Sequence, residues 1–245
     1  EIGDVIIMRA YRLHSPIAFF ASEPKPEGIS HLMYQIQRFH SFLWASGGIY
    51  SDYFIHQIDE LSWMKGAWPV KAHALGGRHY REDSHGNRYL DQNLDTYAVE
   101  YTYPDGTRLC YYGRNMAGCH REFSSFAYGT KGSAVISAAG HDSRGIRTYK
   151  GHDMQKADLI WQAPRAPSCY QLEFDELIDA IRQNKSYNEA KRGAEASLVA
   201  AMGRMAAHTG QVITYDQILK HEHEFAPDLD KLTIDSPAPV LPDPN

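Results

Sequence analysis

Seven short strand-like segments separated by turns fill residues 70–161, and they limit the possible fold more than any other feature of this 245-residue sequence. The segments are 70–73, 94–103, 108–112, 122–128, 133–137, 146–150 and 158–161. The connections 104–107 (Pro-Asp-Gly-Thr) and 129–132 (Gly-Thr-Lys-Gly) are typical of hairpin turns. Sequential hairpins predict an antiparallel meander. Alternation places Tyr97, Val99, Tyr101 and Tyr103 on one face, so we expect helices on that side, with small polar residues, water or another subunit on the other.

The segments outside this stretch predict one more long strand and several helices. A strand is expected from Val5 to Tyr11, helices over 31–45, from Ser51, over 174–181 and over 188–210, and a short strand over 212–215 followed by a turn that Asp216 caps. The predicted class is α+β, a large, mostly antiparallel open sheet with helices on one face and the other face available for oligomer contacts. Residues 1–225 form this domain, and 226–245, with five prolines, form an extended arm.

The helix that begins near Ser51 carries ionisable groups on one side and apolar groups on the other. Successive helical residues turn by about 100°, so one narrow sector holds Asp52, His56, Asp59 and Trp63. The opposite sector holds Phe54, Ile58 and Leu61. Gly47 and Gly48 precede the helix and allow close backbone approach. Such a helix is suited to lining a cleft, although a histidine between two acids is also typical of a hydrogen-bonded surface or subdomain contact.

The spacing Gly-Gly-x-x-x-Asp-x-x-x-His-x-x-Asp over 47–59, followed by a hydrophobic turn and Trp63, resembles the signature helix of the substrate domain in the Gfo/Idh/MocA family of NAD(P)-dependent oxidoreductases. Residues 76–78 (Gly-Gly-Arg), 129–133 (Gly-Thr-Lys-Gly-Ser) and 187–190 (Tyr-Asn-Glu-Ala) resemble stretches of a bacterial branch of that family. Many members have glycine between the acid and the histidine, where this chain has bulky residues at 53–55, which indicates either a reshaped pocket or a member with altered chemistry. The order of predicted elements is that of the family's C-terminal domain.

The resemblance implies hydride transfer between NAD(P) and a carbon that bears a hydroxyl group on a sugar, cyclitol or related polyol. It implies that His56 takes the hydroxyl proton and that Asp52 orients the imidazole. We expect Arg12, Arg38, Arg78 and Asp59 to contact the substrate, the alternatives being surface salt bridges for the arginines and a structural hydrogen bond for Asp59. Two other functions stay open, namely an NAD-dependent glycosidase of the same family and a non-catalytic carbohydrate-binding or assembly module.

The sequence contains no Gly-x-Gly-x-x-Gly, and no βαβ pattern precedes the first strand, so we expect the N-terminal Rossmann domain to be absent from this chain and no NAD or NADP to bind to it alone. The chain opens without Met directly before a strand, so we expect an excised piece of a longer polypeptide, the alternatives being a removed leader or a trimmed tag. We expect a homodimer or homotetramer formed through the sheet.

Charge and hydropathy argue against several other classes of function. The 25 basic against 30 acidic side chains, without a basic cluster, argue against nucleic acid as a partner. No apolar run approaches the roughly 18 residues that a membrane span requires, so we expect no membrane contact and a cytoplasmic protein, although an export signal would precede Glu1. Neither Cys119-His120 nor His221-Glu222-His223 has further ligands at metal spacing, and no metal is expected.

Overall fold

The computed structural model describes residues 1–141 and 145–241, and its centre is a single sheet of nine strands in the order β8-β7-β6-β5-β1-β4-β3-β2-β9. The strands are β1 (Val5–His14), β2 (Lys71–Gly77), β3 (Thr96–Thr102), β4 (Arg108–Asn115), β5 (Glu122–Gly129), β6 (Gly132–Ala138), β7 (Arg147–Lys150), β8 (Leu159–Gln162) and β9 (Ile213–Thr214). The helices are α1 (His31–Gln37), α2 (Leu43–Ser46), α3 (Ile55–Lys65), α4 (Cys169–Arg182), α5 (Ala190–Thr209) and α6 (Tyr215–Leu219). This architecture confirms the α+β class and the mostly antiparallel open sheet.

The N-terminal strand β1 lies at the centre of the sheet, between β4 and β5. It pairs antiparallel with β5 and parallel with β4, whereas every other strand pair in the described sheet is antiparallel. The expectation of one continuous meander was therefore wrong: β2-β3-β4 and β5-β6-β7-β8 are two separate meanders that β1 joins. Sequence alternation cannot reveal such an insertion, because a strand buried on one face has the same pattern wherever it stands in the sheet.

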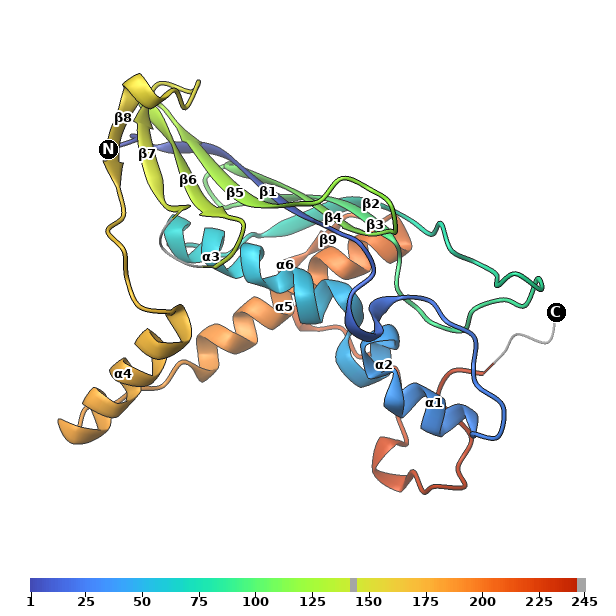
Figure 1. The fold of residues 1–245 in the computed structure, drawn as a ribbon. Helices are drawn as coiled ribbons and strands as arrows, with labels where there is room; N and C mark the ends of the chain where they lie inside the picture. Colours follow the sequence, from blue (N-terminus) through green and yellow to red (C-terminus); the bar gives the residue numbers. More distant parts are fainter. Residues whose placement is uncertain (142–144, 242–245) are drawn as a thin grey trace.

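Helices cover one side of the sheet, as predicted. Figure 1 shows α3, α5 and α6 beneath it, with α1 and α2 toward one end. The tyrosines of β3 that were predicted to share a face are all buried there. The hydroxyl groups of Tyr50 and Tyr101 lie 2.9 Å apart, and Tyr101 also donates to the carbonyl of Val199 on α5. A Cβ atom at Gly203 would lie 2.0 Å from the Tyr101 hydroxyl oxygen, so the small residues of α5 do admit a close neighbour.

The predicted helix over 31–45 is broken into two short helices, α1 and α2, with a 3₁₀ turn (Phe39–Ser41) between them. Arg38 leaves the helical conformation, with φ −109° and ψ 37°, and Phe42 is extended. Apolar spacing alone gave no sign of these breaks. The predicted cap at Asp216 was also wrong, because Thr214 caps α6 and forms a capping box with Gln217.

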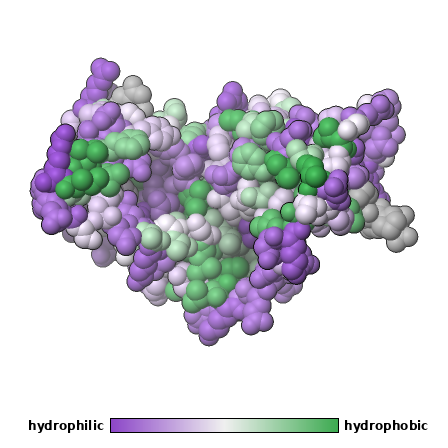
Figure 2. Space-filling model, turned by 90° about the horizontal axis from the view of Figure 1, so that it is seen from below, coloured by the Kyte–Doolittle hydropathy of each residue, from purple (hydrophilic) through white to green (hydrophobic). Residues whose placement is uncertain are grey.

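Helix α4 and the proline-rich segment lie outside the main core. Among the side chains of α4 only Ala180 is buried, and exposed apolar side chains on this helix are Tyr170, Leu172, Phe174, Ile178 and Ile181. Figure 2 shows the helical side of the molecule, where hydrophobic patches alternate with hydrophilic areas. The described end of the arm packs on its own chain: Gln35 of α1 donates to the carbonyl of Val240 at 2.5 Å. The rest of the arm, 242–245, lies outside the described residues.

Candidate active site

The turn that leads into α3 contains two consecutive glycines, both with left-handed backbone conformation. Gly47 and Gly48 have φ values of +77° and +74°, and a Cβ atom at Gly48 would lie 2.6 Å from Oδ1 of Asn93. Arg204 of α5 donates through Nη1 to the carbonyl of Gly47 and to the Ser51 hydroxyl, each at 3.0 Å. Ser51 is therefore an acceptor for Arg204 and lies inside the first helical turn, where its side chain makes no capping hydrogen bond.

A π-helical turn (Tyr50–Phe54) precedes α3, and it changes how Asp52 and His56 lie relative to each other. A π turn holds more residues than an α turn, so the four-residue spacing no longer gives the angular offset of an α-helix. The Oδ2 atom of Asp52 lies 3.1 Å from Nε2 of His40, and the structure shows no hydrogen bond between Asp52 and His56. The acid predicted to orient His56 thus contacts a different imidazole. Short π-helical segments are frequent at functional sites.

The side chain of His56 on α3 is exposed, whereas its neighbours Phe54, Gln57 and Ile58 are buried. Its ring centroid is 4.6 Å from that of His141, which follows β6. No hydrogen bond joins the His56 ring to any residue within 1–141 and 145–241. Burial, followed by the nearby His141 and Arg12, lowers the pKa of His56 to about 4, against an opposing contribution from Glu60. The ring is therefore neutral at pH 7.

Arg12 of β1 is buried, and its guanidinium lies between two aromatic rings. The Cζ atom is 4.1 Å from the ring centroid of Tyr53 and 3.9 Å from that of Phe123. Its Nη1 lies 3.3 Å from Nε2 of His141. This stacked, desolvated arrangement is one that arginine accepts and lysine does not reproduce. The structure thus brings Arg12 and His56, both predicted site residues, into one cluster.

Glu60 lies one turn after His56 on α3 and collects three polar contacts from the neighbouring strands. Its Oε1 accepts from the hydroxyls of Ser125 at 2.6 Å and Ser137 at 2.8 Å, and its Oε2 lies 3.6 Å from Nδ1 of His141. A carboxylate with several hydrogen bonds is stable at a partly buried position. Glu60 and His141 were not predicted as site residues. Only the folded chain brings the segment after β6 next to α3, although Glu60 is a helical (i, i+4) neighbour of His56.

Asp59 faces away from this cluster and connects two helices. Its Oδ1 accepts a hydrogen bond from Arg192 of α5 at 2.7 Å. The Arg192 guanidinium also lies over the rings of Trp63 and Trp68. Burial raises the pKa of Asp59, and Arg192 opposes the rise. This geometry corresponds to the structural alternative considered for Asp59 from the sequence.

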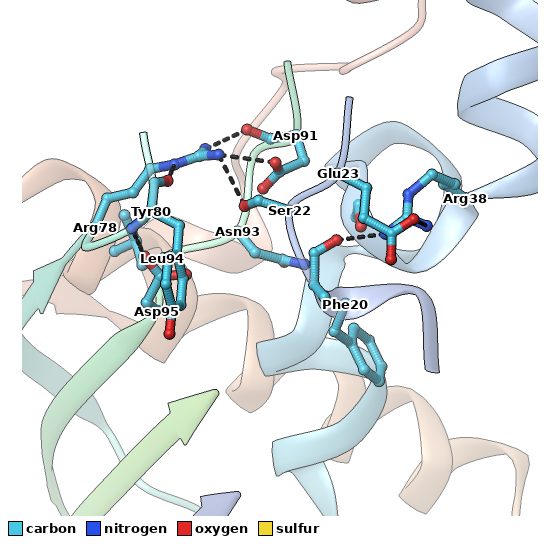
Figure 3. Close-up of polar contacts among 12 residues, drawn as sticks. Phe20, Ser22, Glu23, Arg38, Arg78, Tyr80, Asp91, Asn93, Leu94 and Asp95 are labelled. Atoms are coloured by element: carbon cyan, nitrogen blue, oxygen red, sulfur yellow. Dashed lines mark hydrogen bonds and ion pairs between the residues drawn. The ribbon is translucent and has the colours of Figure 1, made fainter. Parts of the chain in front are cut away.

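Arg38 and Arg78 both hold the loop that follows β1. Figure 3 shows Arg38 directed at Glu23 and Arg78 directed at Asp91 and Ser22. The Arg38–Glu23 and Arg78–Asp91 distances are 2.7 Å and 2.8 Å. Burial raises the pKa of Asp91, and the Arg78 charge opposes the rise. The two arginines therefore have protein acceptors here, and substrate contact by either one stays a prediction.

A cavity of about 690 Å³ borders the His56 cluster. It is lined by His141 and by residues 165–170, which comprise the end of the connection from β8 and the first residues of α4. The described residues contain no group of three or more His, Cys, Asp or Glu side chains placed to hold a metal ion. Among the same residues, no helix has the length and apolar character required to cross a bilayer.

The fold of this chain is similar to that of several solved structures. The chain matches an aldose-aldose oxidoreductase from Caulobacter crescentus complexed with glycerol (TM-score 0.62, 16% identity, 87% of this chain and 56% of that chain). It matches levoglucosan dehydrogenase in complex with NADH and levoglucosan (TM-score 0.61, 15% identity, 87% and 59%). It also matches scyllo-inositol dehydrogenase from Lactobacillus casei with bound NAD(H) and scyllo-inositol (TM-score 0.56, 20% identity, 88% and 58%).

These matches confirm, at the level of the fold, the resemblance to Gfo/Idh/MocA-type oxidoreductases, and they are consistent with the C-terminal domain of those proteins. The chain spans less than three fifths of the length of these three proteins. No protein-family model matches the sequence, and no curated protein matches it.

Proposed function

We propose that this chain is the substrate-binding and oligomerisation half of an NAD(P)-dependent oxidoreductase that acts on a hydroxyl group of a sugar, cyclitol or related polyol. The observation that carries the proposal is the state of His56: a partly exposed, neutral imidazole on the predicted signature helix, without a hydrogen-bond partner among the described residues. The fold supports the same reading, since the similar structures carry glycerol, levoglucosan or scyllo-inositol.

In this proposal His56 accepts the proton of the substrate hydroxyl. A group with a pKa of about 4 is a weak base. A weak base is sufficient, because departure of hydride from the carbon turns the hydroxyl into a protonated carbonyl, which is a strong acid. The low pKa also ensures that the imidazole is unprotonated at neutral pH, the form that can accept the proton.

NAD or NADP supplies the hydride acceptor when bound, and we assign its binding to a part of the polypeptide outside this chain. The chain offers no glycine-rich strand-to-helix turn for a pyrophosphate, and the similar solved proteins are longer. The contribution of this chain is therefore to bind and orient the polyol and to take its proton.

Asp52 is proposed to contribute together with His40. The His40 ring packs against Phe39 and Phe20, with centroid distances of 3.9 Å and 4.5 Å, which holds it against the Asp52 carboxylate. Asp52 keeps a partly exposed side chain and can accept a hydrogen bond from a second hydroxyl of the substrate. Asp52 is thus proposed as a substrate-binding acid, with His40 as its fixed partner.

The open face of the sheet is proposed as the homodimer or homotetramer contact. Tyr11 and Tyr112, which are direct partners on β1 and β4, stack there with centroids 5.4 Å apart, and Phe126 of β5 packs edge-on to Tyr11. Tyr112 is exposed. Aromatic side chains on an uncovered sheet face are typical of a contact between subunits.

The test compares wild-type full-length gene product with its His56→Ala variant on a panel of sugars and polyols, following NAD(P)H absorbance. Loss of a general base predicts a fall in kcat/KM of at least about a hundredfold. The matched control is His73→Ala, which removes an exposed histidine on β2. Undiminished turnover in the His56 variant would remove His56 from the chemistry, and release of free sugar without net cofactor reduction would point to glycosidase activity.

A further inference from the structure

Three side chains on different elements contact one another in sequence on the helical side of the sheet. Arg12 on β1 contacts His141 after β6, and His141 contacts Glu60 on α3. Arginine only donates hydrogen bonds, so Nε2 of His141, 3.3 Å from Nη1 of Arg12, must be the acceptor. The remaining proton of a neutral His141 is then on Nδ1, which lies 3.6 Å from Oε2 of Glu60. The guanidinium and the carboxylate thus select one tautomer of His141.

Both ends of this series of contacts are fixed by their surroundings. Arg12 cannot swing away, because its guanidinium lies between the rings of Tyr53 and Phe123. Glu60 is held by the hydroxyls of Ser125 and Ser137 on two adjacent strands. His141 is partly buried and touches Phe123 edge-on, with centroids 4.6 Å apart. Its ring therefore has one position and one preferred tautomer.

His56 lies on this fixed ring. The two imidazole centroids are 4.6 Å apart with the rings tilted by 50°, a packing contact without a hydrogen bond between them. His141 therefore supports the His56 ring without using either of its nitrogen atoms. Two imidazolium ions at this separation would repel each other strongly, so the pair accepts a second proton only with difficulty.

We propose that His141 is a positioning residue for His56: held by Arg12 and Glu60, it supports the His56 ring and leaves its nitrogens free for the substrate hydroxyl. The proposal rests on the proposed role of His56 as proton acceptor. In this proposal Arg12 holds the His141 ring, instead of contacting the substrate as expected from the sequence. None of the three supporting side chains needs to touch the substrate.

Among the residues that the structure describes, three charged or titratable groups act on His56. They are Arg12 from β1, His141 from the segment after β6, and Glu60 from its own helix α3. Burial, His141 and Arg12 lower the pKa of His56, and Glu60 raises it. Burial, the largest cause, remains in His141→Phe, but no second imidazole is left that could carry a competing proton, so the His56 pKa should rise part of the way toward its ordinary value.

The first experiment is an NMR titration of the histidine side chains in this chain, wild type against His141→Phe. We expect the midpoint of His56 to rise by about one pH unit, the size that marks strongly coupled sites. His208 is an internal reference, since its pKa is also lowered to about 4 but by burial and by Arg204 and Arg78. A His208 midpoint that stays low shows an intact fold. An unchanged His56 midpoint in a folded variant would overturn the proposal.

The second experiment reads the His141 tautomer from its ring ¹⁵N shifts at pH 7. We expect the proton on Nδ1 in the wild type and a loss of that preference in Arg12→Met, which keeps an apolar stem between the two rings. A wild-type His141 with its proton on Nε2 would overturn the proposal without any need for the Phe variant to fold.

Kinetics separate this proposal from the proposed function. In the full-length gene product, His141→Phe should lower kcat by about tenfold or more, leave KM nearly unchanged, and move the acid limb of the pH profile toward higher pH. If His56→Ala has no effect on turnover, the proposed function fails while the NMR results still decide the His141 contact. If His56→Ala abolishes turnover and His141→Phe changes neither kcat nor the pH profile, the positioning role fails alone.

Discussion

Replacement of His208 by glutamine should remove a large part of the acid sensitivity of this fold. His208 lies on α5, where its Nε2 is 3.2 Å from the Tyr97 hydroxyl. That hydroxyl already accepts the N–H of Leu94, so its own proton points to His208, whose ring is the neutral acceptor. Burial, followed by Arg204 and Arg78, lowers the pKa of His208 to about 4 from the ordinary value of 6.5.

The sign of the effect follows from that difference. An imidazole that resists protonation in the folded state costs very little stability above pH 6.5. The penalty grows as the pH falls below that value and is complete below about pH 4. For one such group the penalty is about 0.2 kcal/mol at pH 7 and about 2 kcal/mol at pH 5. Wild-type unfolding free energy should therefore fall by about 1.8 kcal/mol between these two pH values through His208 alone.

Urea denaturation followed by circular dichroism at pH 7 and pH 5 measures this difference. His208→Gln also loses a hydrogen bond to Tyr97, but that loss, about 1 kcal/mol, is nearly the same at both pH values and cancels. The control is His73→Gln, at an exposed position on β2, which should keep the wild-type drop. A His208 variant that loses as much stability as the wild type on acidification would refute the reasoning, since another group would then carry the effect.

Two further predictions concern the turn before α3 and the open sheet face. Gly48→Ala should lower the unfolding free energy by at least about 2 kcal/mol, because the backbone there is left-handed and a Cβ atom would lie 2.6 Å from Asn93. Gly86 also has a left-handed backbone, but no atom lies within 4 Å of its Cβ position, so Gly86→Ala should cost only about 1 kcal/mol. Equal losses in thermal or urea melts would contradict the contact argument. Tyr112→Lys should reduce the oligomer mass seen in analytical ultracentrifugation, whereas Leu229→Lys, exposed in the C-terminal segment, should not, and an unchanged mass for Tyr112→Lys would locate the interface elsewhere.

Local pattern predicted most strands of this fold but not their order in the sheet. Each of the seven predicted strands overlaps an observed one, and the buried face of β3 is the one that alternation selects. Period-two alternation reports which face is buried, and that information is local. The position of β1 between β4 and β5 depends on pairings with residues about 100 positions away, and no local pattern records them.

The candidate site was predicted only as far as one helix could show it. His56 was found because its spacing and its family motif lie on a single segment. His141 was not found, because it follows β6 and reaches His56 only through the sheet, and His40 was not found as the partner of Asp52 because it precedes the glycine turn. Sequence spacing also assumed an α-helix from Ser51, whereas the first turn is π-helical.

The π-helical turn explains why two imidazole–acid sets lie on either side of Tyr53. The Tyr53 ring contacts Arg12 on the His56 side, and it contacts Phe20, which packs on His40, on the Asp52 side. In a regular α-helix Asp52 would lie nearer to the sector of His56, and its carboxylate could orient the His56 imidazole directly. With the wider turn, the acid that supports the His56 cluster is Glu60, one turn later, acting through His141. The bulky Tyr53 side chain then separates Asp52, the proposed substrate-binding acid, from His56, the proposed proton acceptor.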